Sequence, residues 1–139
     1  MFSNILVALD GSKKSFEALD IALEFAQKFN AKLSAINVVQ PVIWTSNPAD
    51  AVKLEESMCK FQDETLARAE RRAKEKGVKL RALKARGYPA DEILNEAKNS
   101  KVDLIIIGSR GLSGIDKFLL GSTSDRIVQH ASCKVFIVK

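Results

Sequence analysis

The fold is decided by the stretch VDLIIIGSRG, which spans residues 102–111. Its first six residues are nearly all branched and apolar, which is typical of a parallel strand buried on both faces. Gly108 and Gly111 follow the strand, and nine residues later a second cluster, GST at 121–123, precedes a segment that favours a helix. Because glycine permits a positive φ and close approach to the main chain, the sequence predicts two tight turns at the ends of one strand-to-helix connection.

Such a connection offers two anion sites. Successive N–H groups in a glycine turn form an anion-binding nest, and the free N–H groups of the next helix, aided by its dipole, form another. The chain contains neither G-x-x-x-x-G-K-[ST] nor G-x-G-x-x-G after its first strand, so the two commonest phosphate motifs are excluded. A lone G-x-x-G also occurs in ordinary turns, whereas the complete spacing is far more specific. We interpret the segment as a two-part cradle for a polyphosphate.

The apolar periodicity predicts strands and helices in alternation. Strands are expected near residues 4–9, 32–39, 78–85, 102–107 and 133–138, and helices near 15–29, 48–77, 90–99 and from 124 onward. This alternation implies a parallel sheet with right-handed crossovers, for which one open arrangement has the strand order 3-2-1-4-5. In such sheets ligands bind beyond the carboxyl ends of the strands, where the order reverses. Asp10 at the end of the first strand and Gly108 at the end of the fourth should therefore meet at the site.

Helix ends and inner faces are predicted as well. Ser12 is expected to cap the first helix, and Asn47 and Pro48 to open the second. The inward positions are expected to be Phe16, Leu19, Leu23, Ala26 and Phe29 in the first helix, Leu54, Met58, Phe61 and Ala69 in the second, and Ile93, Leu94 and Ala97 in the third.

Length and composition indicate one domain with an independent core, since the chain has 139 residues. It contains no apolar run of about 18 residues, and its first residues lack the features of a secretory signal. Cys59 and Cys133 lie far apart and form no C-x-x-C pair, which favours reduced thiols over a disulfide. We therefore expect a cytoplasmic protein with no membrane partner.

Positive charge is concentrated in one segment. Residues 68–86 contain nine Lys or Arg and two Glu, a net charge of +7, whereas the whole chain carries +5. Such a segment is either a solvated helix face whose cations complement the helix dipole, or a docking patch for nucleic acid or an acidic partner. No nucleic-acid motif and no interleaved aromatic set accompanies it, so nucleic acid is not expected.

No catalytic residue and no metal ligand is predicted. The single histidine, His130, lies near the end of the last helix, where the dipole favours a cation. No Cys–His or Ser–His spacing indicates a nucleophile with its base. No acidic cluster indicates a dedicated Mg²⁺ site, so Mg²⁺ or Mn²⁺ would arrive on nucleotide phosphates. Hydrolysis of ATP is left open, and any such activity should be slow.

The fifth strand predicts an oligomer. Residues 135–138, VFIV, are all apolar, and the strand lies at an open edge of the expected sheet. A long apolar edge invites aggregation unless it is covered. Two-fold pairing of identical edges would close this surface, which predicts a homodimer through the C-terminal strand.

The chain resembles the universal stress protein family over nearly its whole length. G-x-x-G, nine residues and G-[ST] is similar to the nucleotide-binding signature of that family, and residues 5–12, 87–90 and 132–138 resemble its first strand, the turn before its third helix and its last strand. The resemblance implies a Rossmann-like three-layer α/β/α sandwich of the adenine nucleotide alpha hydrolase type, with an open five-stranded parallel sheet in the order 3-2-1-4-5. It also implies one such domain over residues 1–139, ATP or else AMP or cAMP as ligand, and dimerisation through the last strand.

The candidate site residues take different roles. A carboxylate at Asp10 would repel phosphate, so it is expected to bind ribose hydroxyls or a metal-bound water, or else to be a turn residue before Gly11. In the family, the main chain that matches Val38 meets the adenine. Arg110 either pairs with phosphate or is solvated, and Lys117 is a weaker candidate of the same kind. The expected nucleotide-binding residues are Leu9, Asp10, Gly11, Ser12, Val38, Ile107, Gly108, Ser109, Arg110, Gly111, Gly121, Ser122, Thr123 and Ser124.

Three functions remain open at this point. The intact glycines and Asp10 favour a stress-response or signalling module that switches with bound nucleotide and acts on an unknown protein partner. The alternative is an interaction protein of the same fold that works without ATP, through its dimer face or the basic segment. A slow ATPase is the third.

Overall fold

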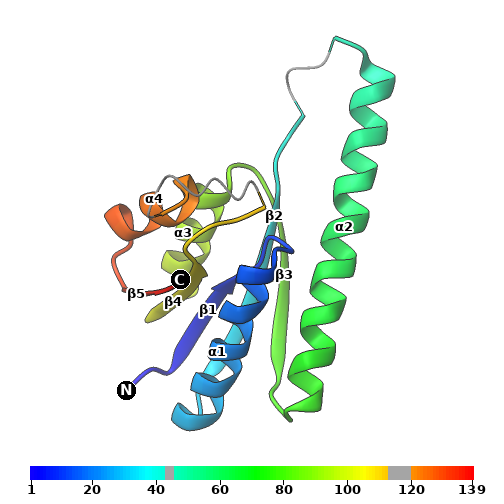
Figure 1. Cartoon of the computed structure of the whole chain (residues 1–139). Helices are drawn as coiled ribbons and strands as arrows, with labels where there is room; N and C mark the ends of the chain where they lie inside the picture. Colours follow the sequence, from blue (N-terminus) through cyan, green and yellow to red (C-terminus); the bar gives the residue numbers. More distant parts are fainter. Residues whose placement is uncertain (43–45, 113–119) are drawn as a thin grey trace.

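The computed structural model describes residues 1–42, 46–112 and 120–139, and within them five strands alternate with four helices. In chain order the elements are β1 (Asn4–Ala8), α1 (Lys13–Phe29), β2 (Lys32–Val39), α2 (Pro48–Glu75), β3 (Leu80–Arg86), α3 (Pro89–Asn99), β4 (Leu104–Gly108), α4 (Ser122–His130) and β5 (Lys134–Val138). The strands form one parallel sheet in the order β3-β2-β1-β4-β5 (Figure 1). The predicted order is confirmed, and each bound that the sequence analysis gives lies within two residues of the observed one.

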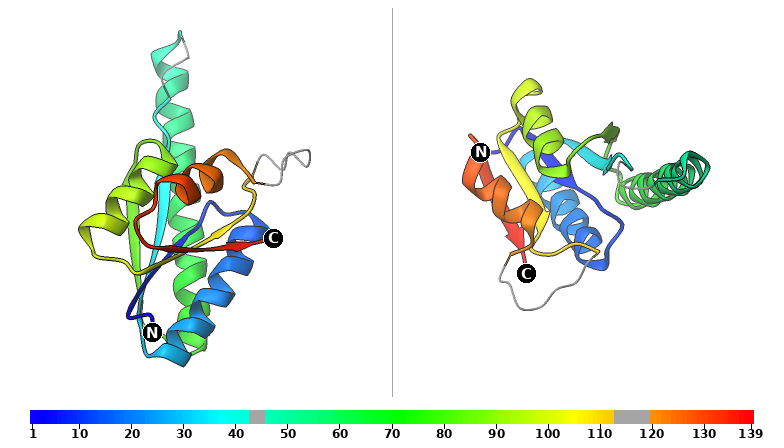
Figure 2. Two further views of the ribbon diagram at one scale, coloured as in Figure 1. Left: turned by 90° about the vertical axis from the view of Figure 1, so that its left-hand side faces the viewer. Right: turned by 90° about the horizontal axis from the view of Figure 1, so that it is seen from above.

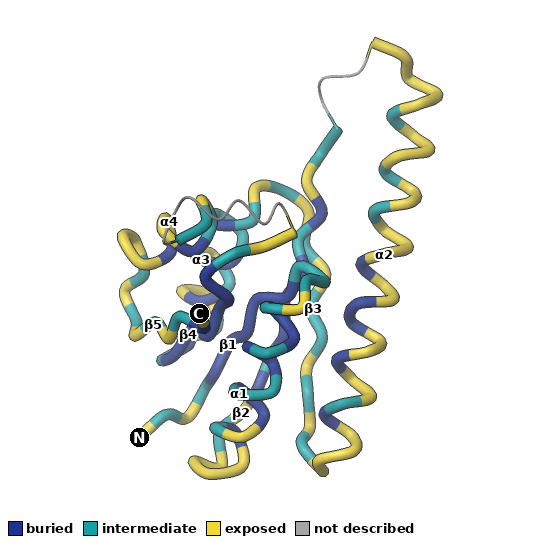
Figure 3. The backbone as a smooth tube through the Cα atoms, in the orientation of Figure 1, coloured by how far each residue is buried: buried dark blue, intermediate teal, exposed yellow. Residues whose placement is uncertain are grey.

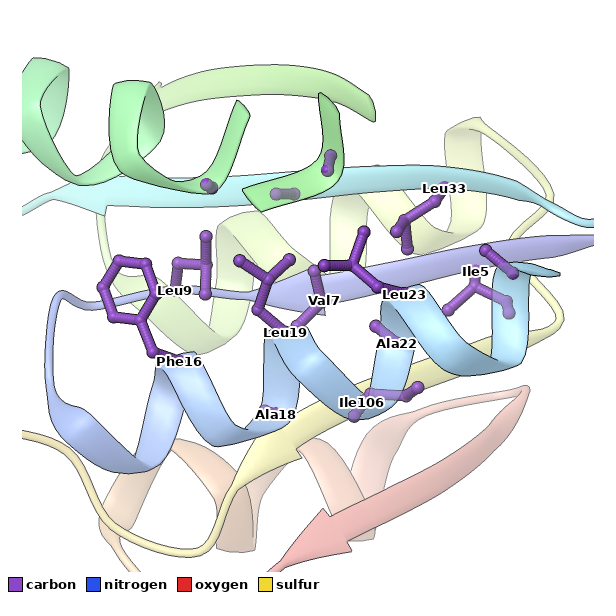
Figure 4. Close-up of a cluster of buried hydrophobic side chains, with 14 of the residues drawn as sticks. Ile5, Val7, Leu9, Phe16, Ala18, Leu19, Ala22, Leu23, Leu33 and Ile106 are labelled. Carbon is purple, nitrogen blue, oxygen red and sulfur yellow. The ribbon is translucent and has the colours of Figure 1, made fainter. Parts of the chain in front are cut away.

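Helices cover both faces of the sheet. α1 and α2 lie on one face, and α3 and α4 on the other (Figure 2). The central strands β1 and β4 are buried almost throughout, which explains why their sequences are continuous apolar runs instead of alternating ones. On the first face, Leu19 and Leu23 of α1 share a cluster with Val7 of β1 (Figure 4). On the second face, Ile127 of α4 shares a cluster with Ile105 of β4.

Both predicted helix caps are present. The hydroxyl of Ser12 accepts a hydrogen bond from the main-chain N–H of Ser15 at 3.1 Å, which opens α1. The side chain of Asn47 accepts from the N–H of Ala49 at 3.0 Å, which opens α2. The sequence also indicates an irregular loop over residues 40–47, of which residues 43–45 lie outside the described residues.

The inward face of α1 is predicted correctly except at its last residue. Phe16, Leu19, Leu23 and Ala26 are buried, whereas Phe29 is 37% exposed. Phe29 lies at the end of the helix, where its ring makes an edge-to-face contact with the half-buried ring of Phe25, with centroids 5.8 Å apart. In α3, Ile93 and Ala97 are buried as expected and Leu94 is half-buried.

The expected inward face of α2 is wrong for the first half of the helix. Ala69 is buried, but Met58 is half-buried and both Leu54 and Phe61 are more than 40% exposed. The 28 residues of α2 span about 42 Å, whereas the eight residues of β2 span about 26 Å, so the helix extends past the sheet. Figure 3 shows the buried positions of α2 only along its lower half. They are Gln62, Thr65, Leu66, Ala69 and Ala73.

Candidate functional site

A cavity of about 340 Å³ opens at the carboxyl ends of β1, β2 and β4. The segment after β4 and the first turns of α3 and α4 complete its walls. Its size lies in the range of small-ligand sites, about 300–1,000 Å³. Eleven of the fourteen expected residues line it, namely Leu9, Asp10, Val38, Ile107, Gly108, Arg110, Gly111, Gly121, Ser122, Thr123 and Ser124. The point at which the strand order reverses therefore carries the cavity, as predicted.

Three expected residues do not line the cavity, because each has a structural task. Gly11 has a φ of +90°, and a side chain there would collide with the ring of Phe61 from α2. Ser12 is occupied as the cap of α1. Ser109 is 4% exposed, and its main-chain N–H donates to the carbonyl oxygen of Val138 at 2.8 Å.

The two glycine turns are joined to each other through Ser109. Its carbonyl oxygen accepts from the main-chain N–H of Gly121 at 2.6 Å and from the hydroxyl of Ser124 at 3.0 Å. These bonds place the start of α4 beside the end of β4. The N–H of Gly121 and the hydroxyl of Ser124 thus hold the cradle together, so this N–H of Gly121 serves the fold instead of the phosphate donor role expected for it.

Donors for an anion remain in the first turn of α4. Ser122, Thr123 and Ser124 line the cavity. The first main-chain bond of the helix runs from the N–H of Asp125 to the carbonyl oxygen of Gly121. The N–H groups before Asp125 therefore have no acceptor within the helix, and the positive end of the helix dipole adds to them.

Asp10 bridges two turns. Its Oδ1 accepts from the main-chain N–H of Ser12 at 2.9 Å, and its Oδ2 accepts from the N–H of Leu112 at 3.1 Å. One carboxylate oxygen thus serves the turn after β1, and the other serves the turn after β4. Each oxygen has a second lone pair, so the ribose contact expected for Asp10 is compatible with this geometry.

Seven lining residues were missed by the sequence reasoning. They are Ala8, Ser15, Ile36, Gln40, Pro89, Ile93 and Leu112. Pro89 and Ile93 belong to the start of α3, which reaches the cavity from the face of the sheet opposite α1 and α2. Together with Ile36 and Val38 they make one end of the cavity apolar, whereas the glycine turns and α4 make the other end polar. The cavity therefore suits a ligand with an apolar part and an anionic part.

Charge is sparse at the cavity. Among its described lining residues, Asp10 carries the negative charge and Arg110 the positive charge. Within the described part of the chain, no group of three His, Cys, Asp or Glu side chains is placed to hold a metal ion. His130 lies exposed in the last turn of α4, and Lys117 falls outside the described residues.

The basic segment 68–86 is largely engaged within the molecule. Arg72 pairs with Asp20 at 3.0 Å and Arg81 with Glu96 at 3.9 Å, while Lys84 and Arg86 pair with Asp63 and Glu55 of α2. The guanidinium of Arg68 lies 4.1 Å from the ring centroid of Phe16. These contacts tie α2 to α1 and β3, and β3 to α3, which favours a structural role for the segment over a docking patch. No described helix is long and apolar enough to cross a membrane.

A doubly wound parallel sheet with a half-apolar cavity at its switch point defines a Rossmann-like α/β protein. The sequence model of the Universal stress protein family matches residues 1–139. Universal stress protein YxiE of Bacillus subtilis is 37% identical over 148 residues, which cover 100% of both chains. The chain belongs to the universal stress protein family.

Solved structures agree with this assignment. Universal stress protein UspA from Lactobacillus plantarum superposes with a TM-score of 0.91 at 26% identity, over 99% of this chain and 98% of that one. A universal stress protein solved in complex with cAMP superposes with a TM-score of 0.78 at 31% identity, over 99% and 97% of the two chains.

Proposed function

We propose that this chain binds an adenine nucleotide in the cavity and serves as a nucleotide-dependent switch in a stress response or signalling pathway. ATP is the proposed ligand, with AMP and cAMP as the alternatives. Any Mg²⁺ or Mn²⁺ would be held by the nucleotide phosphates, because the described lining residues supply one carboxylate.

The observation that carries the proposal is the glycine at position 121. Gly121 has a φ of −71° and a ψ of 165°, an extended conformation that any residue adopts. Among the described atoms, a Cβ built there would meet nothing closer than the carbonyl oxygen of Ser109 at 3.4 Å, an ordinary contact. The described part of the fold does not require glycine here, and Ser or Asp is at least as good a helix cap. An anion that approaches the main chain at the start of α4 does require a residue without a side chain.

The two ends of the cavity match the two ends of a nucleotide. Ile36, Val38 and Ile93 provide apolar surface for the base, and the first turn of α4 provides N–H donors for phosphate. Asp10 lies between these ends, at the expected level of the sugar. The complex of a 31% identical family member with cAMP supports an adenine nucleotide as the ligand class.

The proposal includes a homodimer paired through β5. This strand pairs with β4 on one side and ends the sheet on the other. The proposal also includes a cytoplasmic location and a single functional domain over residues 1–139. Both cysteines, Cys59 and Cys133, are free, as is usual in a reducing compartment.

Two variants of Gly121 test the nucleotide site. Gly121→Ala adds a methyl group that the fold accommodates, and Gly121→Val adds bulk where phosphate should approach. Titration calorimetry with ATP, AMP and cAMP should show binding by the wild type, weaker binding by the alanine variant and none by the valine variant. Ala67→Val, on an exposed position of α2, is the matched control and should bind normally.

Circular dichroism keeps folding separate from binding in this comparison. Native spectra with lost binding would support the cradle. The proposed nucleotide site would be rejected if a folded Gly121→Val protein kept its affinity, or if the wild type bound none of the three nucleotides. Mass spectrometry of protein purified under native conditions identifies which nucleotide co-purifies with it.

A further inference from the structure

We propose that the amino ends of β1, β2 and β3 carry a second ligand site, which binds a small organic polyanion with two or more phosphate or carboxylate groups. The nucleotide cavity lies at the opposite, carboxyl ends of the strands. No described residue lines both cavities, so this inference goes beyond the proposed function and does not depend on it.

A cavity of about 910 Å³ opens where these three strands begin. Its walls also include the end of α1, the segment of residues 77–80 that leads into β3, and Ser100 at the end of α3. The volume lies in the range of small-ligand sites, about 300–1,000 Å³. A lone phosphate or sulfate ion would leave most of this volume empty, so the cavity suits a larger ligand.

Positive charge dominates this second cavity. The charged side chains among its described lining residues are all basic, and we call them the cavity cations: Lys32, Lys79 and Arg81. An adjoining hollow shares residues 77–80 and adds Arg71 and Lys74, with Glu70 as its acid. Clefts lined by one sign of charge focus the electric field and concentrate ions of the opposite sign. The charge therefore favours a ligand with several negative groups.

The two lysines among the cavity cations have no role in holding elements together. Within the described part of the chain, no ion pair or hydrogen bond engages the ammonium group of either lysine. Arg81 lies 3.9 Å from Glu96, but its side chain remains 65% exposed. In contrast, Arg72 and Arg86 pair with acids of α1 and α2. The basic segment 68–86 thus divides into cations that join elements and cations that face the cavity.

The strand register brings the cavity cations close to one another. Ser34 of β2 is paired with Arg81 of β3, and Lys32 and Lys79 stand two residues earlier in the chain. Side chains alternate along a strand, so these residues share the face of Ile36, which belongs to the core cluster under α3. Like charges on neighbouring strands are destabilising. Such a conflict with local stability is expected at a functional site.

α3 leaves this corner of the sheet open to a ligand. The helix ends beside β1, where the side-chain amide of Asn4 donates to the main-chain carbonyl oxygen of Ser100 at 2.7 Å. The cavity cations are exposed as a consequence. The hydroxyl of Ser34 and the side-chain amide of Asn30 also line the cavity and supply neutral donors. A polyanion would therefore receive charge-assisted bonds from the cations and further bonds from these two groups.

Nuclear magnetic resonance locates the site in the ¹⁵N-labelled protein. The amide signals of Ser34 and Lys79 should shift to saturation on titration with citrate, a tricarboxylate, or with fructose 1,6-bisphosphate. Acetate, with a single charge, should not saturate them over the same range. The probe that binds more tightly identifies carboxylate or phosphate as the recognised group. Shifts confined to the nucleotide site around Thr123, or no saturation with either probe, would overturn the proposal.

Removal of the two lysines tests their role in binding. In the double variant Lys32→Gln and Lys79→Gln, the affinity for the tighter probe should fall about tenfold or more. Lys53→Gln, at an exposed position of α2, removes the same kind of charge far from the cavity and should stay within about twofold of the wild type. Equal losses per charge removed in both proteins would show that binding follows net charge and not this cavity.

The ligand-free protein separates binding cations from structural ones. Because removal of one lysine relieves repulsion, Lys79→Gln should be at least as stable toward urea as the wild type at low salt. A lower urea midpoint would mean that Lys79 supports the fold, and would contradict the proposal. ATP affinity should be unchanged in the double variant. A wild type that binds citrate or the bisphosphate at Ser34 but binds no nucleotide would refute the proposed function and leave this second site intact.

Discussion

The side-chain amide of Asn37 donates a hydrogen bond to the main-chain carbonyl oxygen of Leu9, 2.7 Å away, and so extends the pairing of β1 with β2 past the last residue of β1. Both residues are buried. The carbonyl oxygen of Asn37 in turn accepts from the side chain of Gln62 in α2 at 2.9 Å. A short polar chain thus connects the floor of the cavity with a helix on the opposite side of the sheet from α3.

Replacement of Asn37 by leucine should destabilise the protein. The substitution keeps the side-chain volume but leaves the carbonyl oxygen of Leu9 without its donor, which costs about 1–3 kcal/mol at a buried site. Urea denaturation should show that decrease in the free energy of unfolding. Asn95→Leu, at an exposed position of α3, should stay within about 0.5 kcal/mol of the wild type. Equal stabilities for the two variants would contradict the role of the bond.

Stability should depend on pH through Asp103. Burial tends to raise the pKa of this carboxyl, but the hydrogen bonds from the N–H and hydroxyl of Ser3 and the N–H of Asn4 outweigh it and lower the pKa. A carboxyl whose pKa is lower in the folded protein contributes stability that is complete above the pKa of the unfolded chain, about 3.9. The contribution is lost as the pH falls from there through the folded pKa.

Thermal unfolding of wild type and Asp103→Asn between pH 3 and pH 7 checks this sign. The difference in stability should be largest at neutral pH and shrink in the acidic range. Glu64→Gln, an exposed carboxyl on α2, serves as the charge control. A difference that grows on acidification would have the wrong sign and would reject the assignment.

The sequence is sufficient to predict the sheet and the polar end of the site, because both depend on local signals. Apolar runs and caps mark each element, and the right-handed crossover rule allows the order 3-2-1-4-5, which the family resemblance also implies. Asp10 and Gly108 end neighbouring strands, so their meeting follows from topology alone. The spacing of Gly111 and Gly121 along the chain predicts the glycine turns without any knowledge of tertiary contacts.

The apolar end of the site could not be predicted in the same way. Pro89 and Ile93 reach the cavity because α3 crosses the sheet at a particular angle, and helical periodicity gives the inward face of a helix but not what lies under each turn. The same limit explains why Leu54 and Phe61 are exposed although they were predicted to face inward. Periodicity gives the inward face of α2, but α2 extends past the end of the sheet.

The two thiols should react at very different rates. Cys59 is exposed on α2, whereas Cys133 is half-buried beside the second core cluster. Burial raises the pKa of the Cys133 thiol, which lowers its thiolate fraction at neutral pH. Titration with a chromogenic disulfide reagent should therefore show a fast and a slow phase of equal amplitude.

Single substitutions assign the phases. Cys59→Ser should remove the fast phase and Cys133→Ser the slow one, and the slow phase should accelerate at higher pH or in denaturant. Two equally fast thiols in the native protein would show that Cys133 is more accessible than the structure indicates.

The dimer predicted through β5 can be tested at Phe136. This residue is 38% exposed on the edge strand, and its ring meets the edge of Phe25 with centroids 5.5 Å apart. A second copy would cover the open edge and the exposed ring together. Phe136→Lys places a charge in that interface and should shift the protein toward monomer. Val128→Lys, on an apolar residue of α4 that is 46% exposed, is the matched control and should leave the dimer intact.

Light scattering coupled to size exclusion at several concentrations measures the outcome. The wild type and Val128→Lys should elute at twice the chain mass of 15.3 kDa, and Phe136→Lys at the chain mass with a native circular dichroism spectrum. Two-fold pairing terminates growth because each copy has one such edge, so larger species should not accumulate. A wild-type mass near 15.3 kDa at every concentration would rule out this dimer. The exposed ring of Phe136 would then require a different partner.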